Sequence, residues 1–250
     1  MTSFRDHFAS AAPADAAFRP RYPAALFAAL AEQAPGRHMA WDCATGSGQA
    51  AIGLAEQFEQ VEATDASAAQ LAAALAHPRV RYRQAPADAS GLAPHSVELV
   101  TVAQALHWLD RPAFYAEARR VLAPGGVVAV WCYGLVELGP GLDEPIREFY
   151  ERTVGPCWPP ERALVDSAYR TIDFPFAELA LPAMTMEAEL TLEELGGYLG
   201  TWSAVLGYRS ARGKDPVAPL LDRLRGAWGG AQRRRPARWP LALRVGRVTP

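Results

Sequence analysis

The chain has 250 residues, half of them hydrophobic, which is enough for one sizeable buried core rather than two independent domains. The net charge of −2 argues against a general affinity for nucleic acid. No apolar run reaches the roughly 20 residues that a membrane span needs, and acidic residues near the N-terminus argue against a signal peptide. Cys43, Cys132 and Cys157 form no CxxC pair. We therefore expect a cytoplasmic protein with no membrane partner.

Strand and helix patterns alternate in the first half of the chain. Helices are expected at residues 24–34, 50–58, 67–76 and 111–123, and strands at 38–44, 60–65, 80–85, 96–106 and 127–133. Ser67 is a good N-cap for the third helix, and Pro112 suits the first turn of the fourth. Repeated units of this length imply parallel strands with right-handed crossovers, so the sequence predicts a doubly wound, Rossmann-like α/β sheet.

The pattern changes after Tyr133. Residues 134–170 are helical or irregular in pattern, residues 183–190 alternate like a strand, and residues 191–208 and 216–230 are helical in pattern. A last strand is expected at 238–248. We therefore expect a single domain over residues 1–250, in which residues 134–230 add a helical substrate cap with one further strand.

The C-terminal region is strongly basic. Eight arginines and no acidic residue lie between Arg223 and Pro250. Two interpretations fit this composition: a solvated arginine-rich surface, or a basic rim that attracts acidic substrates.

A glycine-rich turn, DCATGSGQ, follows the first strand. Such a turn lets the backbone approach a ligand, and the helix after it offers unpaired N–H groups. Gly46 and Gly48 are present, but Ala51 stands where the dinucleotide pattern GxGxxG has its last glycine, which disfavours NAD. Asp65 ends the second strand, where a carboxylate can accept both hydroxyls of a ribose.

Asp42 lies directly before the turn. A carboxylate there suits a cationic amino group, directly or through water, and would repel a pyrophosphate. S-adenosylmethionine carries such an amino group and a sulfonium, but no phosphate. A structural role for Asp42, as a buried carboxylate that caps the turn, is the alternative.

Five motifs in this order resemble the class I S-adenosylmethionine-dependent methyltransferases. They are DCATGSG, ATDASAAQL, APADASGL, VAQALHW and RRVLAPGGVVAVW, within about residues 15–133. More narrowly, FRPRYP, QALHW, TWSAV and the terminal WPLALRVGR are similar to the small-molecule branch with a type 11 methyltransferase domain, which contains trans-aconitate methyltransferase. This resemblance implies a seven-stranded, mostly parallel sheet, an N-terminal lid at residues 1–37 and a cofactor-binding core at 38–133.

The resemblance also implies where S-adenosylmethionine would bind. The turn would cradle the methionine part, Asp65 the ribose, and the loops after the next strands the adenosine. The implied cofactor residues are Asp42, Ala44, Thr45, Gly46, Ser47, Gly48, Asp65, Ala66, Ser67, Gln70, Pro86, Ala87, Asp88, Gln104 and Ala105. Two departures stand out: Ala44 replaces the glycine common in this loop, and Pro86 replaces an aspartate and offers neither a carboxylate nor an N–H. Asp88 either borders the adenine or is a solvated loop acid.

His107 and Trp108 follow the fourth strand, at the sheet edge where doubly wound folds bind ligands. His107 is a candidate general base or substrate contact, or else a structural histidine. Trp108 either packs in the core or lines the pocket near the sulfonium. By resemblance, Arg19 and Tyr22 lie on the segment over the cofactor, and Arg19 is a candidate clamp for an acidic substrate. Trp131, Tyr133, Tyr198 and Trp202 are candidates for an aromatic pocket, with core packing as the alternative for each.

Methyl transfer from a sulfonium is a direct displacement, so the protein must chiefly align the nucleophile and exclude water. A carboxylate, with a pKa near about 4, is ionised at neutral pH and needs no base, whereas a phenol or carbon acid would use one, for which His107 is the candidate. We expect O-methylation of a carboxylate on a small, possibly acidic acceptor. C- or N-methylation of a quinone-like or lipid acceptor, an NAD-dependent oxidoreductase and a non-catalytic cofactor-binding protein are alternatives. No spacing suggests a metal site, and the oligomeric state is open.

Overall fold

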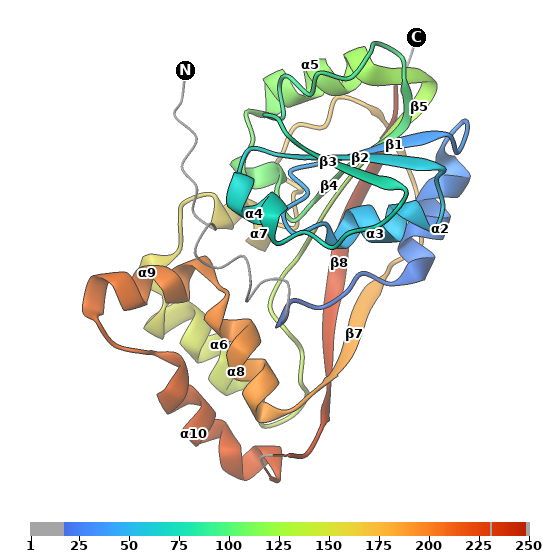
Figure 1. Cartoon of the computed structure of the whole chain (residues 1–250). Coiled ribbons are helices and arrows are strands. Elements are labelled where there is room, and N and C mark those ends of the chain that lie inside the picture. The colour runs from blue at the N-terminus through green and yellow to red at the C-terminus, as the bar shows by residue number, and fades with distance from the viewer. Residues whose placement is uncertain (1–17, 231, 249–250) are drawn as a thin grey trace.

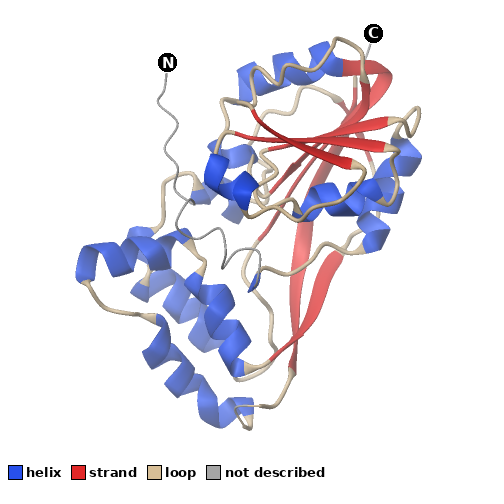
Figure 2. Cartoon of the chain, viewed as in Figure 1, coloured by secondary structure: helices blue, strands red, loops and turns tan. Residues whose placement is uncertain are grey.

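The computed structural model describes residues 18–230 and 232–248. A central sheet carries helices on both faces, and two long strands connect it to a separate group of helices, the cap (Figure 1). Figure 2 shows the same division, with strands crossing the core and helices filling the cap. The strands lie in the order β3 (Val80–Gln84), β2 (Gln60–Asp65), β1 (Met39–Cys43), β4 (Val97–Ala103), β5 (Leu122–Tyr133), β8 (Arg235–Arg247) and β6 (Ala177–Leu179), and β7 (Thr185–Leu190) pairs with β8.

The five N-terminal strands of the sheet are parallel. They are β1 (Met39–Cys43), β2 (Gln60–Asp65), β3 (Val80–Gln84), β4 (Val97–Ala103) and β5 (Leu122–Tyr133). Buried apolar runs such as Val127–Tyr133 suit strands that are covered on both faces. Their shared carboxyl edge is the expected ligand-binding edge. The predicted doubly wound α/β sheet is confirmed.

Helices α2 (Ala24–Gln33), α3 (Gln49–Ala55), α4 (Ala68–Ala72) and α5 (Arg111–Val121) flank these strands. Ser67 caps α4 by accepting a hydrogen bond from the Gln70 amide at 3.3 Å, as predicted. Helix α2 packs closely on α3, because a β-carbon at Gly53 would lie 2.0 Å from the Phe27 ring. Helix α2, which lies in the segment expected to be an N-terminal lid, therefore belongs to the layer of helices that covers one face of the sheet.

The cap contains α6 (Asp143–Glu148), α8 (Leu192–Gly200), α9 (Ser203–Arg212) and α10 (Val217–Trp228) (Figure 1). Strand β8 (Arg235–Arg247) joins cap and core, because its first half pairs with β7 (Thr185–Leu190) and its second half is antiparallel to β5. The short helix α7 (Arg162–Asp166) follows α6 in the chain and precedes β6. It packs against the 3₁₀ turn Leu106–Trp108 that follows β4, and its Val165 carbonyl faces Cys132 of β5.

Three boundaries differ from the sequence analysis. The chain from 134 to 230 holds two strands rather than one, because β6 (Ala177–Leu179) is too short to show an alternating pattern. The helix expected at 191–208 is interrupted at Thr201 and Trp202, which separate α8 from α9. Strand β8 begins at Arg235, three residues before the expected strand, through its pairing with β7.

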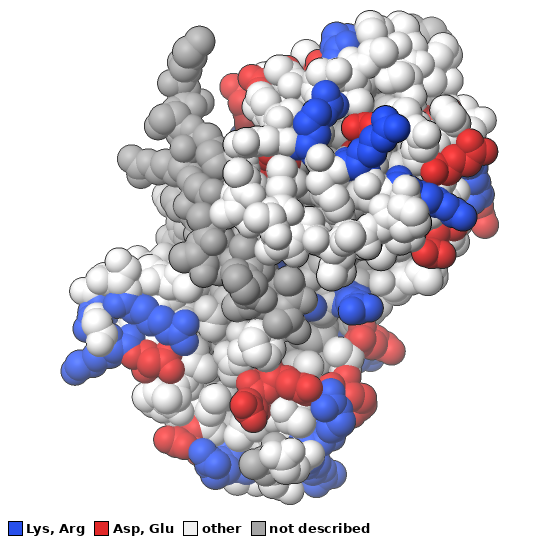
Figure 3. All heavy atoms as spheres, in the orientation of Figure 1, with Lys and Arg blue, Asp and Glu red and all other residues white. Residues whose placement is uncertain are grey.

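The C-terminal arginines form local pairs rather than an open basic rim. Seven of the eight contact a carboxylate or a backbone carbonyl: Arg223, Arg225, Arg234, Arg235, Arg238, Arg244 and Arg247. On the face in Figure 3, basic and acidic side chains alternate around the cap. The solvated-surface interpretation is the one that fits. In the part of the chain that the structure describes, every helix is too short or too polar to span a bilayer.

Candidate active site

The turn after β1 adopts an unusual backbone conformation. Ala44, Gly46 and Gly48 have φ of 54°, 57° and 85°, which places all three in the left-handed region. Glycine adopts this region freely, whereas alanine is strained there by about 1 kcal/mol. Alanine in place of glycine at position 44 therefore strains the backbone, and the turn is still left-handed at Ala44, Gly46 and Gly48.

Gly48 is the glycine that the turn requires most. A β-carbon there would lie 2.1 Å from the Tyr82 hydroxyl, which is fixed by a 2.8 Å hydrogen bond to the Leu75 carbonyl. We expect Gly48→Ala to lower the free energy of unfolding by about 3 kcal/mol, from backbone strain plus overpacking. A thermal melt should then show a fall in Tm of roughly 6–12 °C.

Gly213→Ala is the matched control. Gly213 also has a left-handed φ, of 62°, but a β-carbon there would meet no atom within 4 Å. It should lose about 1 kcal/mol from strain alone. Equal destabilisation of the two variants would contradict the close packing of Tyr82 on Gly48.

Asp42 is completely buried at the end of β1. Its two carboxylate oxygens accept hydrogen bonds from the hydroxyls of Thr45, at 2.6 Å, and Thr101, at 2.7 Å. Burial raises the pKa of Asp42 to about 6, against the lowering effect of these two hydroxyls. This arrangement fits the structural alternative, in which Asp42 braces the turn through Thr45.

Asp65 ends β2 beside the turn and is half-exposed. One carboxylate oxygen accepts a hydrogen bond from the Gly46 amide and the other from the Ser67 amide, both at 2.8 Å. These two amides fix the orientation of the carboxylate beside the turn. Gln70 lies over the same turn, because its Oε1 would be 3.7 Å from a β-carbon on Gly46.

The remaining proposed cofactor residues lie at the ends of β3 and β4. Pro86 and Asp88 are exposed and Ala87 is half-buried. The exposure of Asp88 fits the alternative in which it is a solvated loop acid. Gln104 has a left-handed φ of 54°, and its side-chain amide forms hydrogen bonds with both the N–H and the carbonyl of Tyr133. Gln104 therefore ties the end of β4 to the end of β5.

A pocket opens between this edge of the sheet, α7 and the cap. It is lined by Arg19, Gln104, His107, Trp108, Tyr133, Gly134, Trp158, Pro159, Arg162, Tyr198, Thr201, Trp202 and Ser203. Six of the eight residues predicted to contact substrate are therefore brought together. Within residues 18–230 and 232–248, no aspartate or glutamate lines the pocket.

Tyr22 and Trp131 are the two predicted substrate residues that do not line this pocket. Trp131 is fully buried, and the Tyr22 ring covers it edge-on at a centroid distance of 5.4 Å. Phe27 of α2 also packs against Trp131, at 6.5 Å. The core-packing alternative is therefore the one that fits Trp131, because Tyr22 and α2 cover that side of β5.

His107 lies in a short 3₁₀ turn, Leu106–Trp108, and is almost completely buried. Its Nδ1 lies 2.8 Å from the hydroxyl of Tyr169. Burial, together with the charges of Arg162 and Arg19, lowers the pKa of His107 to about 3. His107 is therefore neutral at physiological pH and a weak base.

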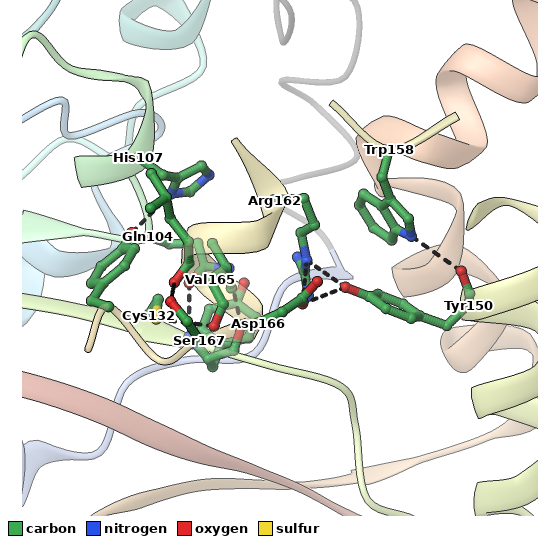
Figure 4. Close-up of polar contacts among 12 residues, drawn as sticks. Gln104, His107, Cys132, Tyr150, Trp158, Arg162, Val165, Asp166 and Ser167 are labelled. Atoms are coloured by element: carbon green, nitrogen blue, oxygen red, sulfur yellow. Dashed lines mark hydrogen bonds and ion pairs between the residues drawn. The ribbon is translucent and has the colours of Figure 1, made fainter. Parts of the chain in front are cut away.

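Arg162 is the principal site residue that the sequence analysis missed. It lies at the start of α7, and its Nε donates hydrogen bonds to the Tyr150 hydroxyl at 2.7 Å and to Asp166 at 3.2 Å (Figure 4). The guanidinium lies 4.6 Å from the centre of the Trp158 ring, a cation–π geometry. Tyr150 in turn donates a 2.5 Å hydrogen bond to Asp166. The irregular pattern of residues 134–170 gave no signal for this cluster.

Comparisons with known proteins agree on one family. Residues 41–130 match the family described as methyltransferase domain. A Saccharomyces cerevisiae protein, named for S-adenosylmethionine-dependent methyltransferase activity, is 29% identical over 124 residues, 46% of this chain and 43% of that protein. A methyltransferase-family protein of Dictyostelium discoideum is 31% identical over 227 residues, which cover 89% of this chain and 86% of that protein. The chain belongs to the class I S-adenosylmethionine-dependent methyltransferases.

The fold of this methyltransferase is similar to a solved structure from Anaeromyxobacter dehalogenans, of a protein assigned as a type II methyltransferase. The two are 49% identical with a TM-score of 0.87, over 93% of this chain and 99% of the other. The similarity therefore includes the cap. Family membership leaves the alternative of an NAD-dependent oxidoreductase without support. Within residues 18–230 and 232–248, no three His, Cys, Asp or Glu side chains lie in a group that could hold a metal ion.

Proposed function

We propose that the methyltransferase O-methylates a carboxylate on a small acidic molecule. The observation that carries this proposal is the charge of the pocket: among the residues that the structure describes, two arginines, Arg19 and Arg162, line it and no acidic side chain does. A guanidinium matches the geometry of a carboxylate and can bind it through two parallel hydrogen bonds. An anionic acceptor fits this lining better than a cationic one.

The turn region fits S-adenosylmethionine as the methyl donor. The Asp65 carboxylate, oriented by two backbone amides, suits the two hydroxyls of a ribose. Residues 42–48 and 65–70 contain no lysine or arginine, as suits a cofactor without phosphate. When bound, S-adenosylmethionine would supply an activated methyl group on a sulfonium. We infer that Gly46 and Gly48 give the backbone room to approach its methionine part, and that Asp42 acts indirectly by holding Thr45.

The lining residues have distinct roles in this proposal. Arg162, braced through Nε by Tyr150 and Asp166, would bind the acid and hold it in one orientation. His107 and Gln104 lie at the sheet edge, between the cofactor residues and the cap, where they would contact the reacting carboxylate. The aromatic side chains Trp108, Trp158 and Trp202 would exclude water from the displacement.

The low basicity of His107 supports a carboxylate over other nucleophiles. A carboxylate is ionised at neutral pH and attacks without losing a proton. A phenol or carbon acid would need a base, and the pKa of His107, lowered to about 3, makes this histidine a weak one.

The pH dependence of the reaction checks this point. We expect kcat/KM to show no ionisation of His107 near pH 6.5, because His107 stays neutral at every pH well above about 3. Burial raises the pKa of Asp42 to about 6, so the rate should be level between about pH 7 and pH 8, above the titration of that carboxyl. The exposed His38 is an internal control in NMR titration, since its hydrogen bond with Glu59 raises its pKa and it should titrate. A change in kcat/KM with an apparent pKa near 6.5, present in the wild type and absent in His107→Gln, would contradict the proposal.

A paired acceptor screen tests the proposed function. Purified protein is incubated with methyl-labelled S-adenosylmethionine and a panel of small mono-, di- and tricarboxylic acids, each beside its neutral amide. We expect transfer to at least one acid and to none of the amides. Transfer to amides, amines or quinols in preference to acids would overturn carboxylate O-methylation.

A further inference from the structure

We propose that Tyr169 is a positioning residue that holds His107 in the tautomer with its proton on Nε2, so that His107 donates a hydrogen bond to the acceptor's carboxylate. The last step rests on the proposed function. Neither Tyr169 nor its contact with His107 was suggested by the sequence. The structure brings these residues, 62 positions apart, to a 2.8 Å contact.

The surroundings of the Tyr169 hydroxyl decide the direction of this hydrogen bond. Tyr169 is completely buried. Burial raises its pKa well above the usual value, so the hydroxyl keeps its proton. Among the residues that the structure describes, the hydrogen-bond partner of this hydroxyl is His107 Nδ1, so the buried hydroxyl proton is satisfied when it is donated to Nδ1. With Nδ1 as the acceptor, a neutral imidazole carries its proton on Nε2.

The backbone at Tyr169 is held in a strained conformation. Ala168 and Tyr169 have φ of 55° and 57°, two consecutive non-glycine residues in the left-handed region. Three hydrogen bonds hold this turn: Ala168 N–H to the Val165 carbonyl, Tyr169 N–H to the Leu164 carbonyl, and the Arg244 guanidinium to the Tyr169 carbonyl. Strain of about 1–3 kcal/mol per residue persists only where the surrounding structure enforces it, often at functional sites. At this turn the conformation directs the Tyr169 side chain into the core, where its hydroxyl contacts His107.

The charges around His107 fit its role as a neutral hydrogen-bond donor to a carboxylate. Arg162 and Arg19 both oppose an imidazolium, so His107 is neutral and its tautomer decides its role. An unprotonated Nε2 would repel an acceptor carboxylate, whereas an Nε2–H would complement it. His107 lines the pocket while its Nδ1 is engaged with a core residue, so Nε2 is the ring nitrogen left for a ligand.

Tyr169→Phe tests the assignment, because it removes the hydroxyl and keeps the ring. The first readout is the ¹⁵N NMR spectrum of the His107 ring in the full-length protein without acceptor. We expect a single Nε2–H signature in the wild type and a mixture of tautomers in Tyr169→Phe. The second readout is kinetic: KM for the acid acceptor should rise about tenfold, with KM for S-adenosylmethionine unchanged.

Tyr115→Phe is the matched control. Tyr115 is also a buried tyrosine of the same hydrophobic cluster, but its hydroxyl donates to the Asp173 carbonyl at 3.0 Å and not to His107. It should lose similar stability while leaving the His107 spectrum and both KM values unchanged. A second control is the His107→Gln background, in which Tyr169→Phe should raise the acceptor KM no further.

Two results would overturn the assignment. One is an Nδ1–H signature for His107 in the wild type. The other is an acceptor KM that Tyr169→Phe raises no more than Tyr115→Phe does. An Nε2–H signature in a protein that methylates no acid would instead contradict the proposed function, and would support the tautomer, because the NMR measurement needs no acceptor.

Discussion

Replacing Asp65 by alanine is expected to weaken binding of S-adenosylhomocysteine by about 100-fold. Two hydrogen bonds between a carboxylate and ribose hydroxyls contribute about 3 kcal/mol together, which is about two orders of magnitude in Kd. The variant also removes the acceptor of the Gly46 and Ser67 amides, so part of the loss reflects a less ordered turn. Isothermal titration calorimetry measures the change.

Asp222→Ala is the control for loss of a carboxylate. Asp222 pairs only locally with Arg225 on the exposed face of α10. The Asp222→Ala variant should bind S-adenosylhomocysteine with the same affinity as the wild type. Unchanged affinity in Asp65→Ala would refute the ribose assignment, and with it the proposed placement of the cofactor.

Arg162→Met is expected to raise KM for the acid acceptor by about 100-fold. The methionine side chain keeps the packing on Trp158 but removes the guanidinium, and a buried charge-assisted pair with a substrate contributes about 3 kcal/mol. The Asp166 partner is half-exposed, so it can be hydrated and the fold should survive. Steady-state kinetics with the acid identified by screening would show the effect in KM, while affinity for S-adenosylhomocysteine stays the same.

Two variants sharpen this test. Arg162→Lys keeps the charge and loses the planar fork, so its KM should lie between those of the wild type and Arg162→Met. Arg170→Met removes an exposed arginine of the same segment that does not line the pocket, and should change nothing. A KM for Arg162→Met within about twofold of the Arg170→Met value would show that Arg162 does not bind the acceptor.

The parts of the site that the sequence predicted are those encoded locally. The turn and Asp65 follow directly from strand ends, and a parallel sheet brings strand ends to one edge. His107 and Trp108 were placed for the same reason, and both line the pocket. The fold was predictable because strand–helix units of regular length allow few topologies.

The parts that the sequence could not predict depend on contacts between distant segments. Arg162 reaches the pocket because α7 folds back against the end of β4, and Tyr169 reaches His107 through a strained turn after that helix. No periodicity marks either residue. Trp131 shows the converse: it lies on β5 two residues before Tyr133, which ends the strand, but Tyr22 and Phe27 cover it. Only the course of the N-terminal segment distinguishes the two positions.

The most direct measurement is the chemical stability of the transferred methyl group. After turnover with methyl-labelled S-adenosylmethionine and an acid acceptor, the product is treated with mild alkali. A methyl ester is hydrolysed and releases the label as volatile methanol, so we expect all of the label to become volatile. A label that stays on the acceptor would show methylation at carbon, at nitrogen or at an ether oxygen, and would contradict transfer to a carboxylate.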